Sequence, residues 1–438
     1  MQPQLSLGLK SPYPAPTYAQ RGTNVLQTIF KEHFQDFAAG YEQKYAPTYG
    51  RFRLERITEV AENFISCGDY TQGVARIQCT NPECREELFR PFSCKGFHLC
   101  PSCCQKRTLL FAEYAENDLL LRLPHRFVTL SLPKCLRVFF RHNRKLFSEL
   151  SRLIFDIIRR YFTEAAETTV ESAALLCFQS FGEFLRWNSH WHAIVLEGGF
   201  DEAGNFIHIP FGNLQQITEC LRRRIVGFFL HSKLISKDMA ENLLRWRHSG
   251  FSVDASIVLP GGSSKKRESL AQYLARPPIS LKKVSFESFH GKVLFHTSYN
   301  EYFKENLKLF DAADFIALLT QHLPPKGVQY LRRYGLYSSR SRGKWTCKPY
   351  VAAHAPEGWK QKHADTPDSH EGQQIHDADP PVCSAERRAA WARSIAKVYE
   401  VDSMVCARCG SPMKVLAVIN DPQQVKNDPD NQGLFTIW

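Results

Sequence analysis

The sequence lacks several features that would assign it to a common class. No apolar run approaches the roughly 18 residues that a membrane-spanning helix needs. The first residues, MQPQLSLGLKSPYPAP, have neither the basic start nor the apolar centre of a secretory signal. The chain contains no Gly-x-x-x-x-Gly-Lys-Ser/Thr loop for ATP and no internal repeat. We therefore expect a cytoplasmic protein with no membrane partner, in a compartment that keeps thiols reduced.

Acidic residues are also fewer than basic residues. The 438 residues include 56 Lys and Arg against 44 Asp and Glu, a formal net charge of +12. This charge favours a polyanionic partner such as nucleic acid, although many basic proteins bind none. Hydrophobic residues make up 43% of the chain and aromatics 12%, which is typical of a globular protein with room for two or three domains.

The residue pattern indicates an α+β fold. The strand candidates RFVTLSLP, ALLCFQSFGEF and HWHAIVLEGGF are mixed with helical periodicity at 137–163, 213–230, 236–247 and 266–275. We expect six segments. They are a flexible tail (1–23), an N-terminal helix with a metal-binding domain (24–115), an α+β core (116–300), a basic-aromatic region expected to be helical (301–350), a linker (351–383) and a C-terminal helix with a Cys-x-x-Cys knuckle (384–438).

Half of the 14 cysteines lie between Cys67 and Cys104. Two close pairs within this block match a zinc ribbon, because each pair forms one knuckle and tetrahedral zinc takes four soft ligands. The proposed ligands of this structural zinc are Cys79, Cys84, Cys100 and Cys103. Further donors that could replace one of them are Cys94, His98 and Cys104. The alternative is a set of buried free thiols.

A second half-knuckle lies near the end of the chain. Cys406 and Cys409 have zinc-knuckle spacing, but the sequence around them supplies no second pair. This second zinc site therefore either borrows ligands from elsewhere in the chain or binds no metal.

A histidine pair begins one of the predicted strands. Side chains two residues apart share a face of a strand, so His190 and His192 can reach one cation. Two ordinary histidines are the alternative on spacing alone. Because two imidazoles leave a divalent cation under-coordinated, a third ligand is expected. The candidates are Gln179, Glu268 and Gln272.

Tyr273 lies on a predicted helix that ends before Pro277. A lone tyrosine in such a helix is commonly a core residue. A phenol, with a pKa of about 10, attacks a phosphodiester at neutral pH only with help from a base or a metal. A cation held by His190 and His192 would supply that help, and the phosphotyrosine ester would conserve bond energy for later joining.

Several segments occur in a characteristic order along residues 25–420. They are FSCKGFHLCPSC, RWNSHWHAIVLEGGFDEAG, WRHSGFSVD, YLARPPISL, LTQHLPPKGVQYLRRYGLYSSRSRG and VCARCGSPMKVLAVI. Together they resemble the HUH-type rolling-circle transposases of bacterial insertion sequences, the IS91 family and its common-region relatives. The resemblance implies an HUH endonuclease core in which His190 and His192 bind catalytic Mg or Mn and Tyr273 cleaves single-stranded DNA. It also implies an N-terminal zinc-binding domain.

The chain departs from the family pattern in two places. Some members carry two tyrosines four residues apart on this helix, whereas here Ser269 stands four residues before Tyr273. A second cleavage would then need Tyr273 to be regenerated or supplied by a second subunit, as in a homodimer. After Ile419 the polar sequence DPQQVKNDPDNQGLFTIW indicates a truncated or divergent tail.

Residues 326–350 contain seven Lys or Arg, five aromatics and no acidic residue. Such a stretch can neutralise phosphates and stack on unpaired bases, or it can be a solvated face with its aromatics in the core. The predicted DNA contacts are Lys326, Arg332, Arg333, Tyr334, Arg340 and Arg342. Candidates for holding the scissile strand are Lys265, Lys266 and Arg267. Alternative nucleophiles are Tyr334 and Tyr337.

These observations predict a transposase that nicks and joins single-stranded DNA through a 5′-phosphotyrosine. A zinc-finger DNA-binding regulator without catalysis and a metal-dependent nuclease that uses water are the alternatives. The His-Trp-His strand followed by the tyrosine helix argues against the regulator. The scarcity of clustered carboxylates near His190 argues against the nuclease, because two-metal nucleases need several.

Overall fold

The computed structural model describes residues 24–84, 86–96, 99–212, 214–301, 304–364, 405–406 and 408–419. The predicted tail at 1–23, the alternative donor His98 and the helix expected within 384–438 lie outside the described residues.

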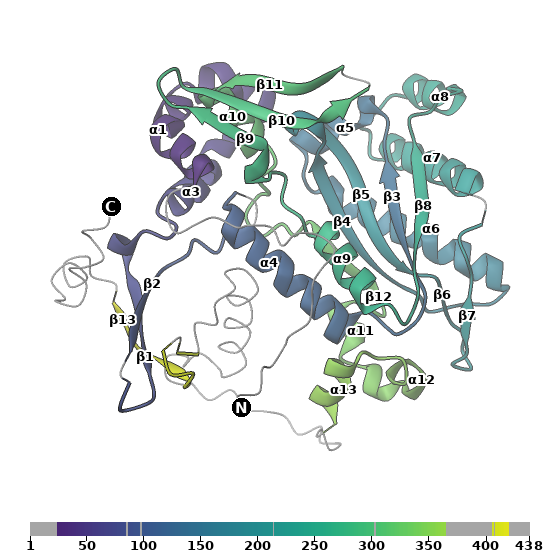
Figure 1. The fold of residues 1–438 in the computed structure, drawn as a ribbon. Helices are drawn as coiled ribbons and strands as arrows, with labels where there is room; N and C mark the ends of the chain where they lie inside the picture. The colour runs from purple at the N-terminus through teal and green to yellow at the C-terminus, as the bar shows by residue number, and fades with distance from the viewer. Residues whose placement is uncertain are drawn as a thin grey trace, which may run out of the picture.

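A five-stranded antiparallel sheet forms the centre of the protein, in the order β12-β4-β5-β3-β8 (Figure 1). In chain order its strands are β3 (His125–Ser131), β4 (Ala173–Phe181), β5 (Trp187–Leu196), β8 (Ser252–Leu259) and β12 (Leu331–Gly335). The three segments predicted as strands form β3, β4 and β5. The expected α+β core with an antiparallel sheet is confirmed.

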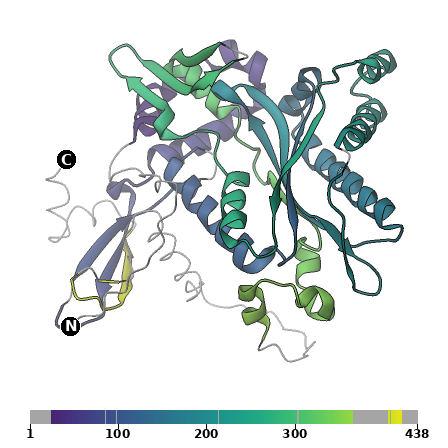
Figure 2. The ribbon, with the colours of Figure 1, turned by 45° about the vertical axis from the view of Figure 1, so that its right-hand side comes forward.

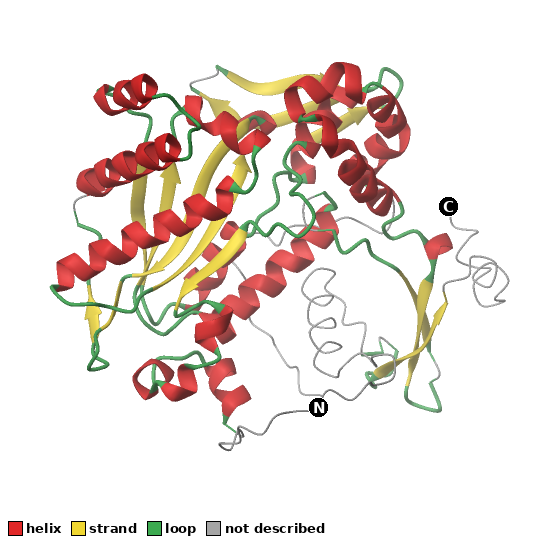
Figure 3. Cartoon of the chain, turned by 180° about the vertical axis from the view of Figure 1, so that it is seen from behind, coloured by secondary structure: helices red, strands yellow, loops and turns green. Residues whose placement is uncertain are grey.

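Helices cover both faces of this sheet. One face carries α5 (Lys134–His142), α6 (Leu146–Ala166), α7 (Leu214–His231) and α8 (Lys237–Arg245), and helices cross it in the view from behind (Figure 3). The other face carries α4 (Pro101–Tyr114), α9 (Ser264–Leu274), α12 (Pro349–Ala352) and α13 (Glu357–His363). Because side chains alternate along β5, Trp191 is buried in the first core and Ile194 in the second.

The N-terminal helices form a separate core with a second sheet. Its elements are α1 (Val25–Ala39), η1 (Tyr41–Tyr45), α2 (Ala46–Tyr49), α3 (Leu54–Ile65), β9 (Val284–Glu287), β10 (Lys292–Asn300), β11 (Glu305–Asp311) and α10 (Ala312–Thr320). Within it Phe30 and Phe37 share one apolar cluster with Val293 and Phe315. This lobe therefore combines the start of the chain with residues on both sides of position 300.

A small ribbon projects from the rest of the molecule (Figure 2). It consists of β1 (Val74–Cys79), β2 (Glu87–Pro91) and β13 (Met413–Ile419), in the order β13-β1-β2. The remaining elements are η2 (Arg51–Arg53), η3 (Tyr70–Gln72), η4 (Ala115–Leu119), η5 (Glu183–Leu185), β6 (Gly198–Phe200), β7 (Phe206–His208), η6 (Leu281–Lys283), α11 (Ser339–Arg342) and η7 (Trp345–Cys347).

Two predictions about the C-terminal half are wrong. The segment from 351 to 363, predicted as the first part of a linker, contains the end of α12 and all of α13, and Trp359 is buried against Trp345 with ring centroids 5.4 Å apart. The basic region, predicted to be helical, contributes the edge strand β12. Its long basic side chains hide the two-residue repeat that would have identified a strand.

Among the described residues, none of the helices combines the length and the apolar character that a bilayer-crossing helix requires.

A buried histidine makes the stability of this fold sensitive to acid. The Nε2–H of His322 donates to the Leu185 carbonyl at 2.9 Å, and its Nδ1 lies 3.0 Å from Ser180 Oγ. Burial lowers the pKa of His322 to about 3, from its ordinary value of 6.5. The unfolded chain therefore takes up this proton first, so the contribution to stability is complete above pH 6.5 and is lost as the pH falls towards 3.

We expect His322→Gln to weaken this pH dependence. Below about pH 6.5 the free energy of unfolding of the variant should fall less steeply than that of the wild type, by about 1.4 kcal/mol per pH unit. Urea denaturation between about pH 7 and about pH 5 measures the slope. His231→Gln, which alters an exposed histidine at the end of α7, is the control and should keep the wild-type slope. Equal slopes for His322→Gln and the wild type would contradict the assignment.

Candidate active site and zinc sites

His190 and His192 lie on the face of β5 that is turned towards α9. Their Nε2 atoms are 3.1 Å apart, and their ring planes are nearly perpendicular at 86°. Two ligands at right angles around a cation, each about 2.1 Å from it, would be about 3.0 Å apart. The spacing of the two nitrogens therefore fits two adjacent positions of an octahedral divalent cation.

The other ring nitrogens hold the two imidazoles in place. The Nδ1–H of His190 donates to the Asn188 carbonyl at 2.8 Å, and Nδ1 of His192 lies 3.1 Å from Thr129 Oγ1. Contacts of this kind orient the Nε2 lone pairs of ligating histidines. Burial lowers the pKa of His190 to about 4 and that of His192 to about 3. Both rings are thus neutral at neutral pH, the form in which histidine binds a metal.

Of the three candidates for a further ligand, Gln179 is placed best. It stands opposite His190 in the β4–β5 ladder and is 2% exposed. Its amide oxygen is buried and has no hydrogen-bond partner among the described atoms, and such an oxygen suits a hard cation. The other two candidates contact each other on α9, where Gln272 Nε2 lies 3.5 Å from Glu268 Oε1.

Tyr273 meets the histidine pair from α9. Its ring lies 5.2 Å from that of His192 and 5.6 Å from that of Phe127, in edge-on contacts. The side chain is 37% exposed, so the phenol is accessible from solvent. The structure therefore brings together the three residues that the sequence analysis proposed for catalysis, and the chemistry assigned to them stays a prediction.

Arg276 was not among the functional residues predicted from the sequence. The guanidinium of this residue lies 4.0 Å from the centroid of the Tyr273 ring, a cation–π distance. It also lines a pocket with Gln179, Leu274 and other residues beside the histidine pair. The signal in the sequence was its position three residues after Tyr273, since residues at that separation are neighbours on a helix surface.

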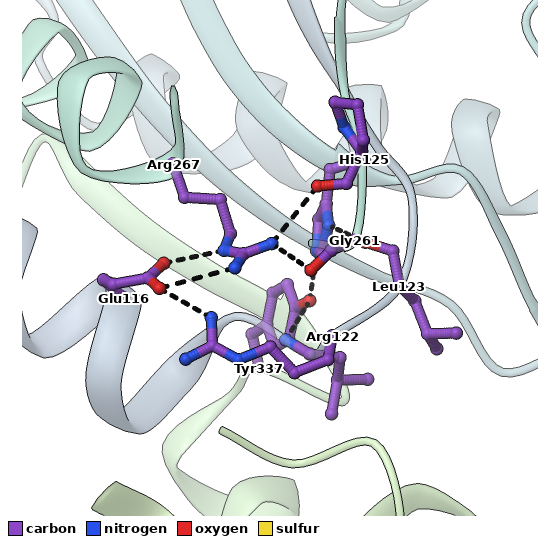
Figure 4. A network of polar contacts seen from close by, with 9 residues as sticks. Glu116, Arg122, Leu123, His125, Gly261, Arg267 and Tyr337 are labelled. Carbon is purple, nitrogen blue, oxygen red and sulfur yellow. Dashed lines mark hydrogen bonds and ion pairs between the residues drawn. The ribbon is translucent and has the colours of Figure 1, made fainter. Parts of the chain in front are cut away.

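A buried ion pair positions the helix that carries Tyr273 (Figure 4). Arg267 of α9 donates to the Glu116 carboxylate at 2.6 Å and also to the carbonyl oxygens of Pro260 and Gly261. Arg122 donates to the same carboxylate at 2.8 Å. Because Glu116 belongs to η4, which continues α4, these contacts connect the start of α9 to α4 and to the loop before α9.

Two alternative assignments from the sequence are wrong. Arg267, proposed to hold the scissile strand, is 2% exposed and paired with Glu116, so it cannot reach a nucleic acid. Tyr337, proposed as an alternative nucleophile, is fully buried. Its hydroxyl donates to Nε2 of His125 and accepts from the Leu121 N–H, and burial raises the pKa of Tyr337.

The cysteines form two clusters of four, which divide the four ligands of the predicted zinc site between them and join Cys406 and Cys409 to one of its pairs. The first cluster is Cys67, Cys94, Cys100 and Cys103, and the second is Cys79, Cys84, Cys406 and Cys409. The predicted grouping is wrong because the two knuckles lie at opposite ends of the ribbon. Cys79 and Cys84 lie at the tip of the β1–β2 hairpin, about 20 Å along a six-residue strand from its base.

The first cluster has the dimensions of a tetrahedral zinc site. Sulfurs bound at about 2.3 Å to one zinc are about 3.8 Å apart. The Sγ atoms of Cys67 lie 3.6 Å from Cys100 and 3.8 Å from Cys103, and Cys94 lies 3.6 Å from Cys103. Cys94, a spare donor in the sequence analysis, is thus a member, whereas Cys104 is not. Cys67 was missed because it has no neighbouring cysteine at knuckle spacing.

The six predicted DNA contacts do not form one face. In β12, Arg333 pairs with Leu175 and points to the α4 side, where it donates to the Tyr114 hydroxyl at 2.7 Å. Tyr334 points to the opposite side and stacks on Phe155 at 5.2 Å. The other four predicted contacts are also spread over different parts of the surface. Arg332 alternates with Arg333 along β12, Arg342 lies over the Tyr114 ring, Arg340 is exposed on α11, and Lys326 lies 3.8 Å from Glu59.

Two family models match the chain. Residues 174–344, which include the histidine pair and Tyr273, match a family described as "Putative transposase". Residues 29–132, which include the first cysteine cluster, match the "Transposase zinc-binding domain" of IS91-type elements. The chain is also 26% identical over 321 residues to the transposase for insertion sequence element IS801 of Pseudomonas savastanoi pv. phaseolicola. That match covers 67% of this chain and 73% of the relative. No solved structure matches the chain.

The protein is therefore a transposase whose N-terminal part is a zinc-binding domain. Both matched segments and the IS801 relative support the IS91 family, which the sequence motifs also indicated.

The buried pair of Glu116 and Arg267 should be essential to stability. We expect Arg267→Met to lower the free energy of unfolding by about 3–5 kcal/mol, because it leaves a buried carboxylate poorly paired. Replacing both partners, in Glu116→Met with Arg267→Met, should recover part of that loss. Lys266→Met, at the exposed neighbouring position, should change stability by less than about 0.5 kcal/mol. Urea denaturation gives all four values, and an effect of Arg267→Met as small as that of Lys266→Met would rule out the proposed anchor.

Proposed function

We propose that this transposase cleaves and joins single-stranded DNA at the ends of its element, with Tyr273 as the nucleophile. The observation that supports this most directly is the contact between the Tyr273 and His192 rings at 5.2 Å on one face of the sheet. The accessible phenol and the buried, neutral histidines provide a nucleophile beside a cation site. The partners would be DNA at the element's ends and at the target, within the nucleoid of a bacterial cell.

The reaction exchanges one phosphodiester for another. The Tyr273 oxygen attacks the scissile phosphorus and loses its proton, while the bond to the 3′ oxygen breaks and that oxygen gains a proton. The products are a 5′-phosphotyrosine and a free 3′-hydroxyl, so no water and no external energy source are consumed. Attack by another 3′-hydroxyl on the phosphotyrosine reverses the chemistry, joins the strands and regenerates Tyr273.

His190, His192 and the amide oxygen of Gln179 would hold Mg or Mn. The 3.1 Å separation of the Nε2 atoms and the unpartnered Gln179 oxygen fit this role. A bound cation of this type stabilises negative charge on phosphate oxygens. The chain's own part is to keep both imidazoles neutral and oriented through Asn188 and Thr129.

Arg276 would position Tyr273 and bind the scissile phosphate. Its guanidinium covers the Tyr273 ring at 4.0 Å and lies close enough to His190 and His192 to lower their pKa values. A guanidinium at this place offers fixed donors to the phosphate oxygens. Because Ser269 replaces a second tyrosine, the second cleavage would use Tyr273 again or the tyrosine of another subunit.

The nucleophile is tested with a single-stranded oligonucleotide from the element's end, labelled at its 3′ end, in the presence of Mg or Mn. We expect the label to move to the mass of the protein on a denaturing gel, because the 5′-phosphate of the 3′ fragment stays attached to tyrosine. Tyr273→Phe should abolish this adduct. Tyr334→Phe is the matched control and should retain it.

The other outcomes identify the rival functions. Cleavage without an attached label would indicate a nuclease that activates water. Binding without cleavage in either metal would indicate a DNA-binding regulator. Loss of the adduct in Tyr334→Phe, with retention in Tyr273→Phe, would show that the nucleophile is Tyr334 of β12.

Arg276 is tested by comparing alanine and lysine at this position. We expect Arg276→Ala to slow formation of the adduct by about 100-fold, since a lost charge-stabilising donor has that size of effect. Arg276→Lys should recover part of the rate, because it keeps the charge but not the fork of donors. Rates at saturating oligonucleotide separate this effect from DNA affinity. Equal rates for alanine and lysine would mean that the charge of Arg276 has no part in the reaction.

A further inference from the structure

The second cysteine cluster combines residues that are more than 300 positions apart in the chain. Cys79 Sγ lies 3.5 Å from Cys409 Sγ, and Cys84 Sγ lies 3.7 Å from Cys406 Sγ. These separations approach the value of about 3.8 Å for two sulfurs on one tetrahedral zinc. They are much longer than a disulfide bond of about 2.05 Å.

Peptide N–H groups surround these sulfurs in a repeated pattern. The N–H of Asn81 donates to Cys79 Sγ at 3.4 Å, and those of Glu86 and Ser411 donate to the sulfurs of Cys84 and Cys409. Each donor lies two residues after its cysteine. In the first cluster the Gly96 N–H donates to Cys94 Sγ in the same way, at 3.3 Å. Such donors stabilise the negative charge of metal-bound thiolates.

The ribbon has too little apolar core to fold without help. Its one apolar cluster consists of the buried residues Ile77, Cys79, Cys406 and Met413, with Cys84 and Leu88 packed against them. Three of these six are proposed metal ligands, namely Cys79, Cys84 and Cys406, and every residue of β2 is half-buried. Small lobes of this kind are held by a metal in place of a core.

The same cluster lies at one end of the β1–β13 ladder. Cys79 pairs with Met413 at one end of the β1–β13 ladder and Val74 pairs with Ile419 at the other. Cys406 and Cys409 form the turn that leads into β13, where the Cys406 N–H donates to the Ser411 carbonyl at 2.8 Å. The metal ligands and the strand register therefore support each other.

We propose that Cys79, Cys84, Cys406 and Cys409 bind a second structural zinc, which attaches the segment 405–419 to the ribbon as its third strand. The matched zinc-binding domain ends at residue 132, so the two C-terminal ligands lie outside it. The site is composite, because the β1–β2 hairpin supplies two of the sulfurs and the C-terminal segment supplies the other two. This inference does not depend on the cleavage chemistry.

Zinc content of the purified full chain tests this proposal. We expect two zinc ions per chain by elemental mass spectrometry. Cys406→Ser with Cys409→Ser should lose one, Cys79→Ser with Cys84→Ser should lose one, and all four substitutions together should still lose only one. Cys220→Ser, which changes an exposed cysteine of neither cluster, should keep two. Additional Cys67→Ser with Cys94→Ser should remove the remaining ion.

Two results would overturn the composite site. One is a wild-type chain that holds a single zinc. The other is a fourfold variant that loses twice as much zinc as each pair, because the pairs would then serve separate ions. Zinc X-ray absorption spectroscopy of the wild type tests the proposal without any variant, so it still applies if the variants fail to fold. It should give four sulfurs at about 2.3 Å for the average zinc, and nitrogen or oxygen ligands would contradict the proposal.

Hydrogen exchange gives a second readout on the ribbon. In the Cys406→Ser, Cys409→Ser variant the amides of β13 should lose protection, while those of β5 in the central sheet should keep it. Unchanged protection of β13 would show that strand pairing alone holds the C-terminal segment.

Discussion

Strand β5 is hydrogen-bonded on both sides, to β3 and to β4, and helices cover both faces of the sheet. Its side chains must therefore alternate between two separate cores. Trp191 fills one core, where its Nε1–H donates to Ser151, and His190 and His192 are directed to the other. The histidine pair follows directly from this constraint, because a shift of one residue in the register would exchange the two faces.

The second requirement is that α9 docks on the face that carries the histidines. The helix has few buried apolar residues, and its placement relies on Arg267, which bonds to Glu116 and to the loop before the helix. A buried ion pair contributes orientation more than net stability, since the cost of desolvation offsets its attraction. Because Arg267 anchors the helix, Tyr273 and Arg276 at its other end stay exposed to solvent.

The zinc-binding part of the chain is stabilised in a different way from the central sheet. The central sheet is held by extensive apolar burial, whereas the ribbon has one small cluster around Ile77 and Met413. A cluster of four cysteines lies at each end of the β1–β2 hairpin, where a bound zinc would take the place of the missing core. The first joins the base of the hairpin, at Cys67 and Cys94, to the start of α4 at Cys100 and Cys103, and so connects the ribbon to the helix that anchors α9.

Local pattern alone determined much of this protein. The strand-like segments predicted β3, β4 and β5, and motif order indicated the transposase family and proposed His190, His192 and Tyr273, which the fold brings together. Only the tertiary structure decided which cysteines share a cluster, that Arg267 is buried, and that β12 joins the sheet. The reason is physical: spacing reports neighbours along one element, whereas these contacts join segments whose approach depends on how the whole chain packs.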